Sequence, residues 1–599
     1  MNSYVYRKPD NLVELFETAV ELFPHNRLFG NKSADGKSLQ WMTYKEIGER
    51  VDNLRAGLAS LGVGKDDAVG IIANNRPEWA IAAFAVYGRQ ARFIPMYEAE
   101  LVKIWHYIVS DSDVKVLLVS KPEIYEKVKD FPGKIKSLEK IILIDGQGPD
   151  TMAALELTGK NNPVPSIQPG PHDTAVLIYT SGTTGDPKGV LLSHGNLTHC
   201  ARSGYHLYPE LDENARSLSI LPWAHSYGQT AELYNWLQFG GSIGFMEKVD
   251  TLGADLALVK PSFLIAVPRV FHKIYDGIRA KMNEEGGLKL KLFLLAEETV
   301  RKKRRFAEQG RSDLITNLKF SILDKIVFEK IRQRFGGRLQ GALTASATMN
   351  PEIAQFFFDI GIPVYDCYGL TETSPAVTMN CSAAYRLGSV GQPVERVHVV
   401  IDNNVVEEGA SDGEIIVYGP NVMQGYHNKP EETKSVMTED GGFRTGDRGR
   451  FDKDGFLYIT GRIKEQFKLE NGKYVFPASI EEDIRLISYV ASAMIFGEGK
   501  PYTICLVYPD IDVITKYASD NNLSNGPEKL VNSKEIRDLI SNEIVKHLKP
   551  KYGGYEIPRK FIFLDEDFSL ENNMLTQTMK LRRTVIVEQF KNEIEALYA

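Results

Sequence analysis

The chain has 599 residues, more than one hydrophobic core normally supports, and we therefore expect at least two domains. Its formal net charge of −7 gives no electrostatic reason to expect nucleic acid as a partner. The four cysteines are not spaced as Cys-x-x-Cys, so neither a disulfide framework nor a structural zinc site is indicated.

The sequence carries no pattern typical of secretion or of a membrane span. Residues 1–10 are polar and lack the apolar core of a signal peptide. The longest apolar run, near residues 79–87, is far shorter than the ~20 residues that cross a bilayer. We therefore expect a cytoplasmic protein.

The first part of the chain alternates between helix and strand patterns. Apolar residues recur at helical spacing over residues 11–23, and Thr43 with Glu46 forms a capping box ahead of a helix that runs to Gly62. Strands are expected at residues 68–73, 91–95, 114–120 and 140–145, with helices at residues 78–88, 101–110 and 123–130. This alternation predicts an α/β fold with a mostly parallel, doubly wound sheet.

A loop rich in glycine, serine and threonine follows an apolar run at residues 174–178, which we expect to be a strand. The loop contains Thr180, Ser181, Gly182, Thr183, Thr184, Gly185 and Lys188, and a helix is expected to begin at Ser193 or His194. Backbone N–H groups and hydroxyls of such a loop can approach phosphate oxygens closely, and Lys188 adds positive charge. The spacing of a Walker A loop is absent, and composition alone leaves an ordinary polar turn between strand and helix as an equal alternative.

Residues 270–335 form a long, charge-rich region that we expect to be helical. It contains the basic cluster Val-Arg-Lys-Lys-Arg-Arg-Phe at residues 300–306. A basic cluster on a helix can dock to anionic lipid, although a solvated helix face is the more common explanation.

The pattern changes after about residue 445. Residues 448–460 predict two strands that turn at Asp454 and Gly455, and the ligands that a calcium loop would need are missing. Beyond the hairpin, helices are expected at residues 477–488 and 534–548, and strands at residues 490–497 and 502–508. These elements predict a small α+β domain with a boundary near Thr460 and Gly461.

Five strings of the chain resemble, in order, the motifs of adenylate-forming enzymes, the superfamily of acyl-CoA synthetases, luciferases and peptide-synthetase adenylation domains. They are the loop at residues 179–190, Tyr-Asp-Cys-Tyr-Gly-Leu-Thr-Glu-Thr at 365–373, Thr-Gly-Asp at 445–447, Gly-Arg-Ile-Lys-Glu at 461–465, and Leu-Thr-Gln-Thr-Met-Lys-Leu-Arg-Arg at 575–583. The last string has the form typical of long-chain acyl-CoA synthetases. The resemblance covers essentially the whole chain and implies a large N-terminal domain of doubly wound sheets, residues 1–460, and a small mobile α+β domain, residues 461–599.

The resemblance implies a site for ATP and Mg²⁺. The ring of Tyr368 would pack on adenine, Thr371 would contact phosphate, and Glu372 with Thr183 would hold the metal. The carboxylate of Asp447 would accept hydrogen bonds from the ribose hydroxyls. The other residues expected to bind ATP or AMP, besides the loop, are Ala345, Ser346, Asp366, Cys367, Gly369, Arg462 and Lys468.

The resemblance also implies catalytic and hinge residues. Lys580 would bridge the carboxylate and α-phosphate oxygens, because a flexible point charge can be delivered and then withdrawn. Lys464 would lie at the pivot of the C-terminal domain. His225 would orient the substrate carboxylate or gate the acyl tunnel, with a histidine packed in the core as the alternative.

Gly472 and Tyr474 would line the path of the pantetheine arm of coenzyme A, although a hairpin turn at Asn471 and Gly472 is equally compatible with this string. One segment departs from the family pattern: Thr-Ala-Ser-Ala-Thr at residues 344–348 replaces the usual Ser-Gly-Gly-Ala-Pro. Ala345 and Ser346 narrow the cleft slightly, which leaves acyl-chain preference open.

The implied function is ATP-dependent ligation of a medium- to long-chain fatty acid to coenzyme A through an acyl-adenylate, with release of pyrophosphate and AMP. The expected partners are these small molecules with Mg²⁺ and no nucleic acid, while peripheral membrane contact and oligomeric state stay open. A fatty acyl-AMP ligase that serves a carrier protein would share every adenylation motif. A non-catalytic binding module would be expected to have lost Lys580 or Glu372, and both are present.

Overall fold

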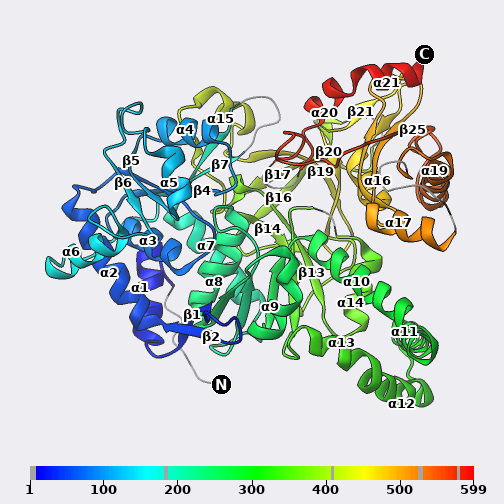
Figure 1. The fold of residues 1–599 in the computed structure, drawn as a ribbon, viewed down its shortest axis with the longest axis horizontal. Coiled ribbons are helices and arrows are strands. Elements are labelled where there is room, and N and C mark those ends of the chain that lie inside the picture. The colour runs from blue at the N-terminus through cyan, green and yellow to red at the C-terminus, as the bar shows by residue number, and fades with distance from the viewer. Residues whose placement is uncertain are drawn as a thin grey trace.

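The computed structural model describes residues 8–180, 186–347, 349–406, 410–463, 465–521, 523, 530–576 and 580–599. It has a large N-terminal domain of sheets and helices and a smaller α+β domain in the C-terminal part, as the sequence predicts (Figure 1). Within these ranges, no helix combines the length and the apolar character needed to cross a membrane.

A seven-stranded sheet, in the order β18-β8-β7-β4-β3-β5-β6, organises the first part of the chain. The predicted parallel strands are β3 (Ala68–Ile72), β4 (Arg92–Met96), β5 (Val114–Val119) and β6 (Lys140–Leu143), joined by β7 (Thr174–Thr180). Every residue of β3 is buried, as expected for a parallel strand covered on both faces. At one edge, β8 (Lys188–Ser193) and β18 (Gly425–Tyr426) run antiparallel to their neighbours.

The helices that flank this sheet begin and end where their sequences provide the signals. They are α1 (Leu12–Leu22), α2 (Tyr44–Ser60), α3 (Pro77–Tyr87), α4 (Val102–Asp111), α5 (Pro122–Val128) and α6 (Met152–Asn161). The predicted capping box at α2 is confirmed, because Thr43 Oγ1 accepts a hydrogen bond from Glu46 N and Glu46 Oε2 accepts one from Thr43 N. Helix α3 is buried almost throughout and lies inside the domain.

The N-terminal domain contains two further sheets. One has the order β11 (Phe263–Ala266), β12 (Gly341–Thr344), β13 (Val364–Gly369), β14 (Ala376–Met379), β15 (Gln392–Pro393), and the other β2 (Leu39–Thr43), β1 (Arg27–Lys32), β10 (Ser242–Phe245), β9 (Arg216–Ser219). Because β12 and β13 are parallel and pair Thr344 with Asp366, the segments that follow Thr344 and Asp366 meet at one edge. The connecting helices include α7 (His194–Leu207), η1 (Gly228–Tyr234), α8 (Asn235–Phe239), α9 (Leu252–Val259) and α14 (Pro351–Asp359).

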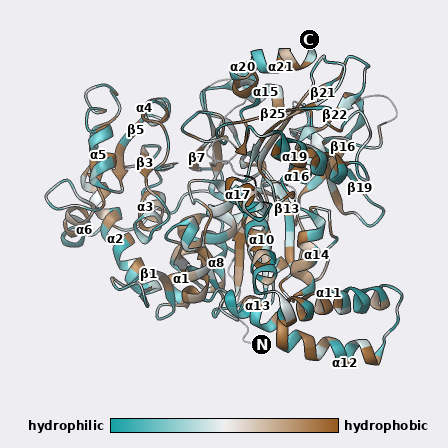
Figure 2. Ribbon diagram, turned by 45° about the vertical axis from the view of Figure 1, so that its right-hand side comes forward, coloured by the Kyte–Doolittle hydropathy of each residue, from teal (hydrophilic) through white to brown (hydrophobic). Residues whose placement is uncertain are grey.

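The predicted helical region over residues 270–335 is confirmed. It consists of α10 (Pro268–Glu285), α11 (Gly287–Glu308), α12 (Leu314–Leu323), a π-helical turn η3 (Asp324–Phe328) and α13 (Glu329–Arg334). Helices α11 and α12 extend from one corner of the molecule, where hydrophobic and hydrophilic residues alternate along them (Figures 1 and 2).

A four-stranded sheet, β16 (His398–Asp402), β17 (Gly413–Tyr418), β19 (Phe443–Phe451) and β20 (Leu457–Arg462), carries the predicted hairpin. Its turn is at Gly455, whose φ of +79° favours glycine. Asp452 and Asp454 both pair with Arg386, so the structure supports a hairpin turn here and not a calcium loop. A short helix, α15 (Pro430–Val436), precedes β19.

The C-terminal domain is built on the sheet β23 (Val490–Phe496), β24 (Ile504–Pro509), β25 (Lys560–Phe563) and a small hairpin, β21 (Phe467–Lys468) and β22 (Tyr474–Val475). Its helices are α16 (Pro477–Ile484), α17 (Ile511–Asp520), α19 (Lys534–Leu548), α20 (Arg583–Gln589) and α21 (Lys591–Tyr598). Two hydrophobic clusters pack within this domain: one contains Ile480 and Ile540, and the other Met494 and Ile586. A separate core is what an independent domain requires.

Candidate active site

The site forms where the ends of β13 and β20 meet the middle of β19. The hydroxyl of Tyr368, on β13, donates a hydrogen bond of 2.7 Å to Asp447 Oδ2 on β19. Arg462 Nε, on β20, donates one of 2.6 Å to Asp447 Oδ1. The Asp447 carboxylate raises the pKa of the Arg462 guanidinium and, together with burial, that of the Tyr368 hydroxyl. Three residues of three separate motifs therefore form one hydrogen-bonded group.

Glu372 lies in the short helix η4 (Thr371–Thr373), directly after β13. Its backbone carbonyl accepts a hydrogen bond of 2.9 Å from Met423 N, and its Oε1 accepts one of 2.9 Å from the Tyr426 hydroxyl. The neighbouring Thr371 is buried and accepts a hydrogen bond from Ser226 Oγ over 3.3 Å. These contacts hold the carboxylate in place, and within the described residues no hydrogen bond or ion pair engages Oε2.

Tyr426 is a residue of this site that the motif strings do not identify. It lies on β18, which pairs with β8, and the Lys188 ammonium lies 5.0 Å from the centre of the Tyr426 ring. One side chain thus contacts both the lysine of the phosphate loop and the carboxylate expected to bind metal. Only the pairing of two strands distant in sequence creates this contact, so the local sequence carries no signal for it.

The loop itself is only partly described. Ser181, Gly182, Thr183, Thr184 and Gly185 lie outside the described residues. Thr180 and Lys188 are paired across the antiparallel strands β7 and β8, and α7 begins at His194 with Ser193 as its N-cap, as predicted. The loop therefore joins two strands, and not a strand to a helix, because β8 lies between the loop and α7.

The arrangement suits Mg²⁺ held mainly by a substrate. Among the described residues there is no group of three or more His, Cys, Asp or Glu that could hold a metal ion. Mg²⁺ in nucleotide sites commonly uses one or two carboxylates with phosphate oxygens and water. Glu372, whose Oε2 has no hydrogen bond within the described residues, fits that mode of binding, whereas Thr183 lies in the part of the loop that is not described.

The residues expected near the nucleotide base line the edge formed by β12 and β13. Ser346 is exposed with a φ of +75°, and Ala345 beside it is buried. Asp366 is buried, which raises its pKa to about 8. Its Oδ2 accepts a hydrogen bond from Met349 N, while Oδ1 has no partner among the residues that the structure describes. A buried polar atom without a partner is costly, so Asp366 is suited to bonding a ligand.

Cys367 and Gly369 serve the packing of β13. Burial raises the pKa of the Cys367 thiol. A Cβ on Gly369 would lie 1.7 Å from the carbonyl oxygen of Pro375, so any larger residue would displace this segment. Where two backbone segments approach this closely, only glycine fits, because it has no Cβ.

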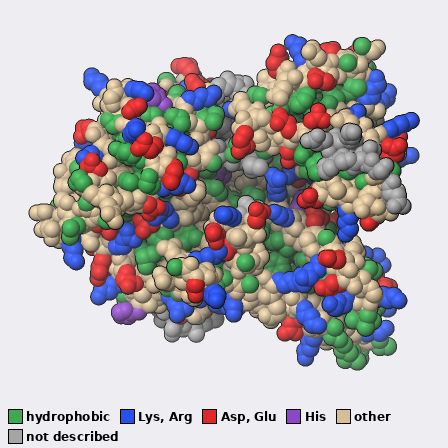
Figure 3. All heavy atoms as spheres, in the orientation of Figure 1, with side chains coloured by type: hydrophobic (Ala, Val, Ile, Leu, Met, Phe, Trp, Pro, Cys, Tyr) green, Lys and Arg blue, Asp and Glu red, His purple; other side chains and the backbone are tan. Residues whose placement is uncertain are grey.

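Lys580 comes from the C-terminal domain and reaches this group. The segment before α20 extends towards β19 and β20 (Figure 1). Lys580 is accessible to solvent. Enclosure by protein and the nearby charge of Arg462 lower the pKa of its ammonium group, whereas the negative charges of Asp447, Glu465 and Glu372 raise it. A side chain that is open to solvent and has several charged neighbours is typical of an open cleft. Figure 3 shows that the surface is hollowed between the two domains.

His225 lies close enough to Lys580 to feel its charge. Burial and the charge of Lys580 lower the pKa of the imidazole to about 4, so His225 is neutral at pH 7. Its Nδ1 accepts a hydrogen bond from Tyr227 N over 3.2 Å, which leaves Nε2 to carry the proton. A neutral, half-buried histidine of this form can donate a hydrogen bond to a carboxylate.

Three predicted residues lie apart from this group. Lys468 and Tyr474 are paired across the β21–β22 hairpin, and Gly472 forms its turn with a φ of +83°. Within the described parts of the chain, no hydrogen bond or ion pair joins these three to Asp447, Glu372 or Lys580. The turn at Asn471 and Gly472 is present, whereas Lys464 lies outside the described residues.

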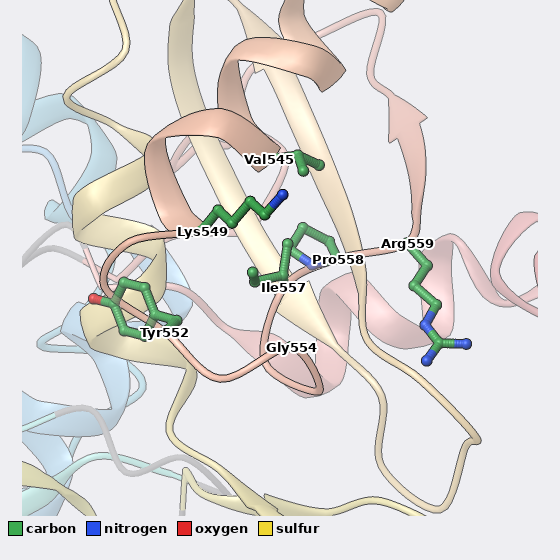
Figure 4. Close-up of a pocket in the computed structure, with 7 residues that line it drawn as sticks. All are labelled: Val545, Lys549, Tyr552, Gly554, Ile557, Pro558 and Arg559. Carbon is green, nitrogen blue, oxygen red and sulfur yellow. The ribbon is translucent and has the colours of Figure 1, made fainter.

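A hollow of about 570 Å³ in the C-terminal domain is lined by other residues. Figure 4 shows Lys549 lying across it and Arg559 pointing away. The lining residues are Val545, Lys549, Tyr552, Gly554, Ile557, Pro558 and Arg559, none of which belongs to the motif strings. The hollow therefore makes no contribution to the candidate site.

Comparison with known proteins is consistent with this geometry. Residues 16–427 match the family described as AMP-binding enzyme, and residues 464–599 match the AMP-binding enzyme C-terminal domain. Long-chain-fatty-acid–CoA ligase FadD15 of Mycobacterium bovis is 32% identical over 570 residues, covering 93% of this chain and 92% of that protein. Long-chain-fatty-acid–CoA ligase 6 of Mus musculus is 30% identical over 631 residues, covering 100% and 88%.

Solved structures show the same fold. The adenylation domain of a carboxylate reductase from Mycobacterium chelonae superposes with a TM-score of 0.78 at 21% identity, covering 98% of this chain and 91% of that one. The anthranilate CoA ligase AuaEII, in complex with anthranoyl-AMP, gives a TM-score of 0.73 at 18% identity, covering 98% and 99%. At these identities the likeness concerns the fold alone.

Proposed function

Because the chain belongs to the family of AMP-binding enzymes, we propose that it ligates a medium- to long-chain fatty acid to coenzyme A at the expense of ATP. The observation that carries the proposal is the position of Lys580, which lies among Asp447, Arg462, Glu372 and His225 although it comes from the C-terminal domain. The ligase names of relatives at 30–32% identity over 93–100% of the chain support a fatty acid as substrate.

In the first half-reaction, a carboxylate oxygen of the fatty acid attacks the α-phosphorus of ATP, the acyl-adenylate forms, and pyrophosphate leaves. Asp447 accepts hydrogen bonds from the ribose hydroxyls, and Lys580 neutralises charge on the carboxylate and α-phosphate oxygens as they approach each other. His225 Nε2–H orients the carboxylate. Mg²⁺, when bound by Glu372 and Thr183, would neutralise charge on the phosphate oxygens.

In the second half-reaction, the thiol sulfur of coenzyme A attacks the acyl carbonyl carbon, the thioester forms, and AMP leaves. We infer that the domain of residues 461–599 first turns about Lys464, which withdraws Lys580 and opens a path past Gly472 and Tyr474. The separate hydrophobic clusters of this domain support such a rigid-body turn. We further propose that the protein is cytoplasmic and contacts a membrane peripherally.

The proposal is tested by measuring pyrophosphate release over fatty acids of graded length, with and without coenzyme A. We expect release with medium- and long-chain acids, and thioester only when coenzyme A is added. Release that never proceeds to a thioester with coenzyme A, but does with an acyl carrier protein, would instead identify a fatty acyl-AMP ligase. Absence of release with every acid would contradict the proposal.

A further inference from the structure

Helix α12 exposes large apolar side chains at one corner of the molecule. Leu314, Ile315 and Leu318 are 84%, 67% and 66% exposed, and Ile322 and Ile326 continue the same surface. Figure 3 shows these green side chains gathered at the lower right, over α12 as placed in Figure 1. Contiguous apolar surface of this kind usually marks a binding surface.

Four of the exposed residues share one side of α12 and of the π-helical turn that continues it. Leu314, Leu318, Ile322 and Ile326 recur every fourth position, which places them in line along α12 and η3. The opposite side is anchored, because residues 316, 323, 327 and 328 are buried. Asp313 caps the first turn by accepting a hydrogen bond from Thr316 N over 3.0 Å. The apolar stripe is therefore a feature of an anchored helix.

Positive charge surrounds the stripe. Residues 301–334 contain eleven Lys and Arg against four Asp and Glu, a net charge of +7, whereas the whole chain carries −7. Lys319 and Lys325 are exposed on the helix that carries the stripe, and Arg301, Lys302 and Arg305 are exposed on the adjoining α11. Figure 3 shows blue side chains on either side of the green patch.

We infer that the α11–α12 hairpin, residues 287–328, docks on a membrane that contains anionic lipid. The apolar stripe would enter the boundary between headgroups and acyl chains, while the Lys and Arg side chains reach the lipid phosphates. A second copy of the chain is a poor occupant, since two hairpins, each with ten Lys and Arg against five Asp and Glu, would face each other. The inference names the surface for the membrane contact proposed above, but it does not depend on acyl-CoA synthesis.

Vesicle flotation with the full-length protein tests the inference. We expect wild type to float with vesicles of phosphatidylcholine and phosphatidylglycerol, to float poorly with phosphatidylcholine alone, and to be released by salt. The variant L314S/I315S/L318S and the variant R301Q/K302Q/R305Q should each lower partitioning at least about tenfold. The matched control is L157S/K160Q on α6, where Leu157 is 60% exposed, and it should float like wild type.

A gain-of-signal measurement keeps the test independent of any loss of folding. Leu318→Trp should show fluorescence quenching by brominated anionic lipid, whereas Leu157→Trp should not. Wild type that does not float with anionic vesicles, or a hairpin variant that floats as well as wild type, would overturn the inference. So would a serine variant that changes only the oligomeric state in size-exclusion chromatography. Pyrophosphate release with a short, water-soluble acid is followed separately, so that failure to bind lipid is distinguished from failure of the proposed reaction.

Discussion

Tyr368 and Asp447, 79 positions apart in the sequence, are joined by a hydrogen bond of 2.7 Å that ties the end of β13 to β19. Arg462 occupies the other oxygen of the same carboxylate. The Asp447 carboxylate is therefore held in place before any nucleotide arrives. An acceptor positioned in advance binds its partner at a lower entropic cost.

Asp447→Asn should raise the KM for ATP at least about tenfold, with a smaller effect on kcat. A hydrogen bond to a charged group contributes about 1.5–3 kcal/mol, and the amide loses that charge while keeping the shape. Tyr368→Phe, which removes only one neutral donor, should have a smaller effect in the same direction. Steady-state kinetics of pyrophosphate release check this, and an unchanged KM for ATP in Asp447→Asn would exclude the ribose role.

Glu372→Gln should raise the Mg²⁺ concentration needed for half-maximal adenylation and lower its rate, with little change in thermal stability. Tyr426→Phe should shift the Mg²⁺ requirement in the same direction by less, because it removes the hydrogen bond that holds Glu372 Oε1. Mg²⁺ titration of both variants and of the double variant is the measurement. We expect the double variant to be no worse than Glu372→Gln, since both act on one carboxylate.

The control for this pair is Tyr418→Phe, whose hydroxyl bonds Asp440 at an exposed position away from the site. Its Mg²⁺ dependence should be that of wild type. Wild-type Mg²⁺ dependence in Glu372→Gln would refute the metal role.

Lys464→Pro should preserve adenylate formation and lower coenzyme A-dependent turnover at least about tenfold, a barrier change of ~1.4 kcal/mol. Proline fixes φ near −65°, whereas a hinge residue must change φ and ψ between two states. Lys464→Ala removes the charge but leaves φ free, and it is the matched control. Single-turnover kinetics of each half-reaction measure both; equal loss of thioester formation in the two variants would place the pivot elsewhere.

Stability should fall as pH is lowered from about 6.5, in part because of His194. This histidine is buried against Tyr87, and burial lowers its pKa from 6.5 to about 3. Between pH 6.5 and pH 3, His194 therefore binds a proton in the unfolded chain but not in the folded one. This difference lowers the free energy of unfolding by about 2 kcal/mol at pH 5. His194→Gln should show a smaller drop in Tm between pH 7 and pH 5 than wild type, and an equal drop would contradict this cause.

The sequence predicts the parallel sheet, the capping box at Thr43 and the hairpin at Gly455, because each depends on residues close in the chain. It misses β8 (Lys188–Ser193), which begins at the lysine of the phosphate loop and ends at Ser193, the N-cap of α7. Tyr426 is also missed, since its contacts with Glu372 and Lys188 exist only after β18 pairs with β8. The approach of Lys580 to His225 depends on how two domains dock, which no local pattern specifies.

The most direct test of the account is a comparison of the two half-reactions in Lys580→Ala and wild type. Lys580 lies among Arg462, Asp447 and Glu372 in an arrangement suited to the adenylation step alone. We predict that pyrophosphate release with a long-chain fatty acid falls by ~10²–10³, the usual cost of one preorganised charge contact, while thioester formation from supplied acyl-adenylate survives. An equal loss in both half-reactions would contradict the account.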